Sequence, residues 1–202
     1  PSSSRRYVQL RLFYGARLEV FCRDQLGPGG YAARNLGIQN ARGQYISFLD
    51  ADDEWWSGHL AHHRRLIAES GCALVATSWL DCREGDQPRF TSLSDETSDG
   101  VLFTLADFLG EYLTKEKVLN TNTISIRGEL FDACGGFPDG ECKRGGDVGT
   151  WLKLVCTARA LFLSARETAI YYRENSTVTR EHCPDVESNS GRLNGGRLVS
   201  LV

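Results

Sequence analysis

The sequence contains no methionine, no long apolar run and no excess of basic residues. Its 23 Lys and Arg are outnumbered by 26 Asp and Glu, giving a net charge of −3, so a broad basic surface for a nucleic-acid backbone is not expected. The apolar runs at 73–80 and 160–163 are far shorter than the roughly 20 residues that span a bilayer, and no signal-peptide pattern is found. We therefore expect a cytoplasmic protein that binds no nucleic acid.

The seven cysteines include no Cys-x-x-Cys pair, the spacing that is typical of zinc knuckles and redox motifs. Their odd number and scattered positions favour reduced, mostly buried thiols over a disulfide framework. The complete absence of methionine over 202 residues, in a chain that starts at Pro1, indicates that the natural beginning of the protein is missing. We therefore expect an N-terminally truncated chain.

The remaining composition, 41% hydrophobic and 24% charged, is typical of a globular protein of one domain. Strands are predicted at 17–22, 45–49, 72–80, 121–126, 161–164 and 168–172. Helices are predicted at 31–41, 57–70, 102–113, 128–134 and 147–158. The segment 83–100 is polar and is predicted to be a loop. Strands that alternate with helices in this way indicate an α/β layered fold.

The most informative segment is an apolar stretch that ends in acid. Residues 45–49 have high strand propensity and predict a buried strand, and Asp50, Asp52 and Asp53 follow directly. Burying such carboxylates without partners would cost several kcal/mol each, so we expect them to face a cleft and a cation. An Asp-x-Asp pattern at the end of a strand suits a divalent metal that holds a phosphorylated ligand.

This acidic segment has other interpretations. Asp52 or Asp53 could simply cap the helix that follows, and this alternative stays open. A calcium loop requires glycine at its sixth position, where Trp55 stands, so that interpretation fails. A phosphatase-type Asp-x-Asp with Asp50 as the nucleophile usually has threonine where Glu54 stands, so it is weakened but also stays open.

Two glycine-rich segments could contribute to the same site. Residues 29–38 place glycines before a helix that carries Arg34, which could pair with phosphate or remain a surface arginine. Residues 143–152 place Asp147 at the mouth of another helix, either as an N-cap or as a carboxylate that accepts a proton from a hydroxyl. Trp151 could floor a sugar site or fill the core. Neither segment has the Walker lysine pattern or the Gly-x-Gly-x-x-Gly spacing of dinucleotide sites.

Taken together, these segments resemble the family 2 glycosyltransferases, which have the GT-A fold. The resemblance rests on Gly-x-Ala-Ala-Arg-Asn-x-Gly-Ile at 30–38, Ala-Arg-Gly-Gln-Tyr-Ile-Ser-Phe-Leu-Asp-Ala-Asp-Asp-Glu-Trp at 41–55, Gly-Gly-Phe-Pro-Asp at 135–139, Gly-Asp-Val-x-Thr-Trp-Leu at 146–152 and Tyr-Tyr-Arg at 171–173. It implies a Rossmann-like α/β fold with a mixed, mostly parallel sheet flanked by helices, missing the first strands.

The resemblance also implies roles for four residues. Asp50 would contact the ribose side of a nucleotide sugar, and Asp52 would ligate Mg²⁺ or Mn²⁺ bridging the diphosphate. Arg34 would help to hold the nucleotide, and Asp147 would act as the general base. The implied substrates are a nucleotide-diphosphate sugar and a carbohydrate or lipid-linked acceptor, joined with inversion in a single displacement.

The sequence departs from the family pattern in three places. The family's first strand and a second strand ending in Asp-Asp-Gly-Ser are absent, which agrees with a truncated chain. Gly146 stands where the family has a glutamate before Asp147. Glu174 and Asn175 stand where many members have a histidine, so a third metal ligand is unassigned, with His182 as a distant substitute.

The leading hypothesis is therefore a metal-dependent hexosyltransferase of cell-surface polysaccharide or glycoconjugate assembly. We expect one GT-A-like domain at 1–175 and a polar tail at 176–202. Peripheral contact with the inner face of a membrane stays open. Two alternatives remain: a metal-dependent phosphoryl-transfer enzyme that uses Asp50, and a catalytically silent fragment or binding module.

Overall fold

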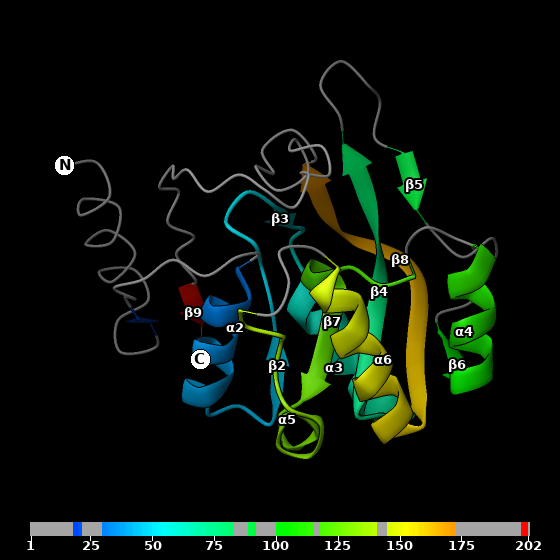
Figure 1. The fold of residues 1–202 in the computed structure, drawn as a ribbon. Coiled ribbons are helices and arrows are strands. Elements are labelled where there is room, and N and C mark those ends of the chain that lie inside the picture. Colours follow the sequence, from blue (N-terminus) through cyan, green and yellow to red (C-terminus); the bar gives the residue numbers. More distant parts are fainter. Residues whose placement is uncertain are drawn as a thin grey trace, which may run out of the picture.

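The structure is a computed structural model that describes residues 18–21, 30–82, 89–91, 100–114, 118–140, 145–172 and 199–201, and a mixed β-sheet between helices is its main feature (Figure 1). The strands are β1 (Leu18–Val20), β2 (Tyr45–Ser47), β3 (Glu54–Trp55), β4 (Leu74–Cys82), β5 (Arg89–Thr91), β6 (Val101–Thr104), β7 (Ile124–Arg127), β8 (Ala160–Tyr172) and β9 (Val199–Leu201). The helices are α2 (Tyr31–Asn40), α3 (His59–Ser70), α4 (Leu105–Thr114), α5 (Glu129–Cys134), α6 (Gly146–Ala158) and the short 3-10 helix η3 (Thr121–Thr123).

The larger sheet has the strand order β2-β7-β4-β8-β3, with β5 paired to β4 and β6 paired to β8. The predicted α/β fold with a mixed sheet is confirmed. Its pairing differs from the expectation, because among the described strands of this sheet only β4 and β8 run parallel. A helix can return the chain to either end of a sheet, so alternating strands and helices do not by themselves fix strand direction.

A second, two-stranded sheet joins β1 to β9 in antiparallel pairing. The segment 176–202, expected to be a polar tail, thus contributes a strand near its end. The division into a domain at 1–175 and a tail remains a prediction.

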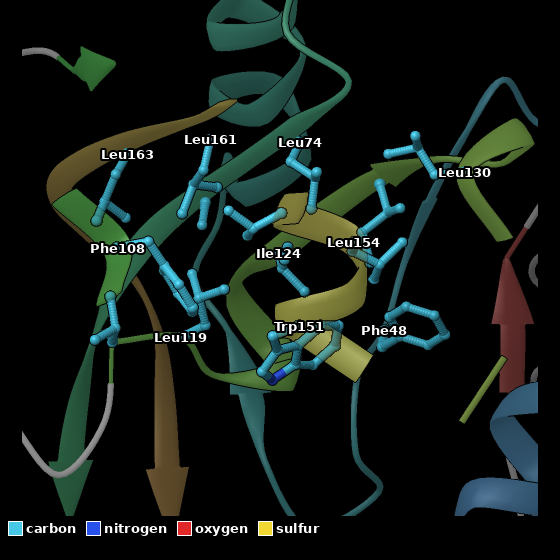
Figure 2. Packing of buried hydrophobic residues seen from close by; sticks show 14 of the residues in the cluster. Phe48, Leu74, Phe108, Leu119, Ile124, Leu130, Trp151, Leu154, Leu161 and Leu163 are labelled. Carbon is cyan, nitrogen blue, oxygen red and sulfur yellow. The ribbon is translucent and has the colours of Figure 1, made fainter. Parts of the chain in front are cut away.

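The two faces of the larger sheet differ in chemistry because side chains alternate along each strand. Ile124 and Ile126 of β7 belong to the apolar core on the side of α6, while Ser125 between them meets α3 on the other side. Figure 2 shows the apolar side, where Trp151 and Leu154 of α6 pack with residues of β4, β7 and β8. This packing fixes the start of α6, which carries Asp147, relative to the sheet.

The opposite face contains a buried network of hydroxyl and imidazole groups. His63 of α3 lies 2.8 Å from Ser125 Oγ through Nδ1 and 3.3 Å from Thr77 Oγ1 through Nε2. His59 Nδ1 lies 2.7 Å from Thr168 Oγ1. Burial lowers the pKa of His59 to about 4 and that of His63 to about 2, mainly by desolvation, so both rings are neutral near pH 7.

Several element predictions are corrected by the structure. The predicted buried strand at 45–49 is shorter, and β2 is only half-buried because it lies at the edge of the sheet order, with β7 as its neighbour. Residues 102–104 are strand rather than helix, since β6 pairs with β8 and α4 begins only at Leu105. The two strands predicted at 161–172 are one strand, β8, with an irregular register opposite Thr77 and Ser78.

The cysteine prediction is also corrected for the described residues. Cys72, Cys82 and Cys134 are half-buried free thiols, and Cys156 is exposed. The expectation of mostly buried thiols is therefore wrong for these four, which lie on or near the ends and outer faces of their elements. The other three cysteines, and most of the predicted loop at 83–100, lie outside the described residues.

Candidate functional site

The acidic segment forms a tight turn between β2 and β3. The backbone N–H of Asp53 donates to the carbonyl oxygen of Asp50 at 3.1 Å, which places Ala51 and Asp52 at the centre of the turn. Helix α3 begins at His59 with Gly58 as its N-cap residue, in the left-handed conformation. The alternative that Asp52 or Asp53 caps this helix is therefore wrong.

Asp50 forms an ion pair with Arg34 of α2. The Nη2 atom of Arg34 donates to both carboxylate oxygens, at 2.7 and 2.9 Å. Arg34 is 9% exposed, and its guanidinium lies 6.0 Å from the ring centroid of Tyr31 and 5.5 Å from that of Phe137. The pair therefore joins two of the residues that the sequence analysis assigned to separate motifs.

Asp52 is half-buried at the centre of the turn, and its carboxylate forms no side-chain hydrogen bond or ion pair with any described residue. Desolvation by burial is the main cause that raises its pKa, and the neighbouring Asp50 charge adds to it. A hydrogen bond from its own backbone and the charge of Arg34 act in the opposite direction. A bound cation would stabilise this carboxylate in its charged form.

Asp53 is held by the protein on both of its oxygens. The backbone N–H of Tyr172 donates to Oδ1 at 2.9 Å, and the Asn122 side-chain amide donates to Oδ2. Desolvation by burial, strengthened by the charges of Asp52 and Asp50, raises the pKa of Asp53 to about 7 despite these hydrogen bonds. Of the three acids in the turn, only Asp50 is paired with an arginine among the residues that the structure describes.

Asn122 is a residue that the sequence analysis did not identify. Its Oδ1 accepts from the backbone N–H of Asp50 at 2.6 Å, and its carbonyl oxygen accepts from Trp55 Nε1 at 2.6 Å. It is 2% exposed and belongs to η3. The signal in the sequence is slight: two asparagines in a segment of alternating threonine, with no pattern that links them to the acidic turn.

Asp147 lies in the first turn of α6, and its Oδ1 accepts from the backbone N–H of Val148 at 3.0 Å. The N–H of Gly146 donates to the Tyr31 hydroxyl at 3.0 Å, and the Tyr31 ring stacks on Phe137. The start of α6 is thus connected to the rings that contact Arg34. The Asp147 carboxylate itself bonds with neither Arg34 nor the described acids of the turn.

Trp151 fills the core rather than flooring a sugar site. It is 3% exposed and meets Phe137 edge to face, with ring centroids 5.5 Å apart. Of the two alternatives for this residue, the structure supports the core.

The metal implied by the family resemblance can be tested against the donor groups of the turn. Within the described ranges, no cluster of three or more His, Cys, Asp or Glu is arranged to hold a metal ion. The oxygens of Asp50 and Asp53 accept hydrogen bonds from other residues, whereas the Asp52 carboxylate is bonded only by its own backbone among the described residues. One carboxylate together with substrate phosphates and water is a usual environment for Mg²⁺, so the residues fit such an ion. His182 lies outside the described residues.

In the part of the chain that the structure describes, none of the helices combines the length and the apolar character that crossing a bilayer requires.

The comparison with protein families gives one match that covers most of the chain. The family model described as Glycosyl transferase family 2 matches residues 3–125. This range includes Arg34, the acidic turn and Asn122, and it ends before Asp147.

Individual relatives agree with this match. The chain is 28% identical to glycosyltransferase AglE of Haloferax volcanii over 142 residues, 70% of this chain and 43% of the relative. It is 42% identical to the amylovoran biosynthesis glycosyltransferase AmsB of Erwinia amylovora over 65 residues, 32% of this chain and 19% of the relative.

A solved structure supports the fold. S. aureus TarS 1-349 in complex with UDP-GlcNAc matches with a TM-score of 0.69 and 21% identity, covering 88% of this chain and 49% of that one. The chain thus spans about half or less of the length of these relatives.

Proposed function

This chain belongs to glycosyl transferase family 2, and from that premise we propose that it transfers a sugar from a nucleotide-diphosphate sugar to an acceptor hydroxyl, with inversion and with a divalent metal. The observation that carries the proposal is the acidic turn. It presents the Asp52 carboxylate, which forms no side-chain hydrogen bond or ion pair with a described residue, beside an Asp50 carboxylate that Arg34 fixes in place.

Each residue of the site has a distinct role in this proposal. Asp52 holds Mg²⁺ or Mn²⁺, which when bound neutralises charge on the departing diphosphate. Asp50 contacts the ribose side of the donor. Arg34 orients Asp50 through the ion pair and supplies positive charge beside the diphosphate. Because the Arg34 guanidinium already bonds Asp50, we propose that orienting Asp50 is its main role and that direct contact with the nucleotide is secondary.

Asp147 is the proposed general base. Its carboxylate accepts the proton of the acceptor hydroxyl while the hydroxyl oxygen bonds to the anomeric carbon and the bond to the diphosphate breaks. Attack opposite the leaving group inverts the anomeric configuration, and no covalent enzyme intermediate is needed. The position of Asp147 at the start of α6, connected through Tyr31 to the rings beside Arg34, supports this role.

The cellular role and place are also proposed. The acceptor is a carbohydrate or lipid-linked hydroxyl in polysaccharide or glycoconjugate assembly, in keeping with the similarity to AmsB, a glycosyltransferase of amylovoran biosynthesis. The site of action is the cytoplasm, with peripheral contact at the inner face of a membrane as an added proposal.

The alternative of phosphoryl transfer through an Asp50 nucleophile gains no support from the geometry. Both Asp50 oxygens accept hydrogen bonds from the charged Arg34, which lowers their nucleophilicity toward phosphorus.

The proposal is tested by calorimetric titration of the protein with UDP in the presence of Mn²⁺. We expect saturable heat that a chelator abolishes, and loss of this heat in Asp52→Ala because the ion loses its protein ligand. Glu54→Gln is a matched control, since Glu54 is an exposed acid two residues away. Within the described ranges, its carboxylate accepts a hydrogen bond only from the Tyr172 hydroxyl, at 3.3 Å. Absence of saturable heat with the unmodified chain would instead favour a catalytically silent fragment.

A further inference from the structure

A single side-chain amide bonds to both ends of the acidic turn. Asn122 Oδ1 accepts from the backbone N–H of Asp50 at the first position, and Asn122 Nδ2 donates to the carboxylate of Asp53 at the last. Asp52 lies between these two anchored residues. The Asn122 side chain therefore links the first and last residues of the turn from outside it. The backbone hydrogen bond from the Asp53 N–H to the Asp50 carbonyl links the same two residues within the turn.

The sheet register explains how Asn122 reaches this position. Strands β2 and β7 pair antiparallel with Ser47 opposite Ser125. Continuing this register three residues beyond the pair brings Asp50 opposite Asn122. If both strands continued, the Asp50 N–H would donate to a backbone carbonyl of the neighbouring strand. Here, where the chain leaves β2 for the acidic turn, it donates to the side-chain Oδ1 of Asn122 instead.

The orientation of the amide is fixed by its own neighbours. Asn120 Oδ1 accepts from the backbone N–H of Asn122 at 2.9 Å and from its Nδ2 at 3.2 Å. In a flipped amide, Nδ2 would face the Asp50 N–H, which is also a donor, and Oδ1 would face two acceptors, the Asp53 carboxylate and Asn120 Oδ1. The backbone carbonyl of Asn122 also accepts a hydrogen bond from the indole Nε1 of Trp55, the second residue of β3.

We infer that Asn122 is a positioning residue: it fixes the turn in the shape that presents Asp52 to the cation and the donor diphosphate. This inference rests on the proposed function. A carboxylate that holds a cation works only if its own backbone is fixed, and groups that orient such ligands typically change metal affinity or activity by about 10- to 100-fold when removed. Asn122 contacts the residues on either side of Asp52 and not Asp52 itself.

The first test compares UDP affinity in the presence of Mn²⁺ for the unmodified chain and for Asn122→Ala. We expect affinity to fall about 10- to 100-fold in the variant, because the turn loses both anchors. Thr123→Val is the matched control. The Thr123 hydroxyl donates to the Asn120 carbonyl at 3.2 Å and is also buried in η3, but it forms no hydrogen bond with the acidic turn. We expect the Thr123→Val variant to have a lower thermal stability and an unchanged affinity for UDP.

The second test exchanges the two partners and does not depend on whether Asn122→Ala folds. Asn122→Asp alone places two carboxylates face to face and should lower the affinity for UDP and Mn²⁺. Adding Asp53→Asn restores a donor and an acceptor in reversed order, with the total charge unchanged. We expect the double variant to recover at least half of the loss on a logarithmic scale, a rescue that a general loss of stability would not produce.

The outcomes separate the two proposals. Absence of saturable heat with the unmodified chain would overturn the proposed function. Normal binding by the unmodified chain together with equal affinity in folded Asn122→Ala, or no recovery in the exchanged pair, would overturn the role of Asn122 alone.

Discussion

Arg34 and Asp50 depend on each other at the scale of single residues. The arginine is buried beside the stacked rings of Tyr31 and Phe137 and bonds both oxygens of the carboxylate. Removing one member leaves the other charge desolvated without its partner, and this cost usually exceeds the net contribution of the pair itself. The two side chains should therefore tolerate joint replacement better than single replacement.

Arg34→Met tests this dependence. We expect it to lower the free energy of unfolding by about 1–3 kcal/mol, because Asp50 loses the donor that faces it. The double variant Arg34→Met with Asp50→Asn should regain part of this loss, since it leaves no unpaired charge. Chemical denaturation of the single and double variants measures both. If the double variant lost more unfolding free energy than the two single variants together, the two side chains would not depend on each other in this way.

Asp147 can be distinguished from the acidic turn by separating binding from turnover. Asp147→Asn keeps the shape of the side chain and its contact with the Val148 N–H but cannot accept a proton. We expect near-normal affinity for UDP with Mn²⁺ and a transfer rate reduced by about 10²- to 10⁴-fold, the usual contribution of a general base. Steady-state kinetics with a donor sugar and an accepted hydroxyl provide the measurement. Full transfer rates in the variant would show that another group takes the proton.

At the scale of elements, Asn35 of α2 joins two segments that are far apart in sequence. Its Oδ1 accepts from the Phe137 N–H at 2.8 Å, and its Nδ2 donates to the Phe137 carbonyl at 2.9 Å. Phe137 in turn lies against Tyr31 and Arg34. The glycine before it is required for this approach, since a Cβ at Gly136 would lie 2.2 Å from Asn35 Oδ1.

Gly136→Ala should therefore push Asn35 out of place and destabilise the protein by about 1–3 kcal/mol, as crowding of a packed site usually does. Gly149→Ala is the comparison, because Gly149 lies in α6 with no heavy atom within 4 Å of the added Cβ. That change should be neutral or stabilising, by up to about 1 kcal/mol. Thermal unfolding of both variants decides the matter, and equal effects would contradict a specific role for Gly136.

At the scale of the whole molecule, the imidazole face of the sheet should make stability depend on pH. The pKa of His59 and His63 is lowered on folding, so below the ordinary histidine pKa of 6.5 the unfolded chain binds protons that the folded chain excludes. Stability should fall as pH drops below about 6.5, by about 1.4 kcal/mol per pH unit for each histidine. Asp53, whose pKa is raised to about 7, acts in the opposite sense over the same range.

The measurement is therefore the difference between two pH profiles of unfolding free energy. His63→Gln removes one titrating ring and leaves Asp53 unchanged. It also leaves unchanged the third imidazole, that of His62, whose Nδ1 lies 3.4 Å from the guanidinium of Arg65. We expect its profile between pH 6.5 and 5 to be shallower than that of the unmodified chain. Identical slopes would mean that His63 is not held neutral by the fold.

Much of this fold follows from local pattern, and the parts that do not follow are those set by pairing. Helix α6 was identified by the helical spacing of its apolar residues, and β4 by its continuous apolar run. The edge position of β2 and the antiparallel direction of β7 were not predictable, because strand order depends on contacts between distant segments. The sequence analysis identified Arg34 and the acidic turn separately, and it missed Asn122 because only the register of β2 against β7 connects it to Asp50.

The anchors of the acidic turn are separated from it along the chain, Asn122 by 69 residues from Asp53 and Tyr172 by 119. A ribosome releases the turn long before it releases either anchor. During synthesis the turn stays unsecured until η3 emerges, and its last bond forms only when the end of β8 has left the exit tunnel. Nucleotide capture by a growing chain should therefore appear late, after almost the whole sheet has been translated.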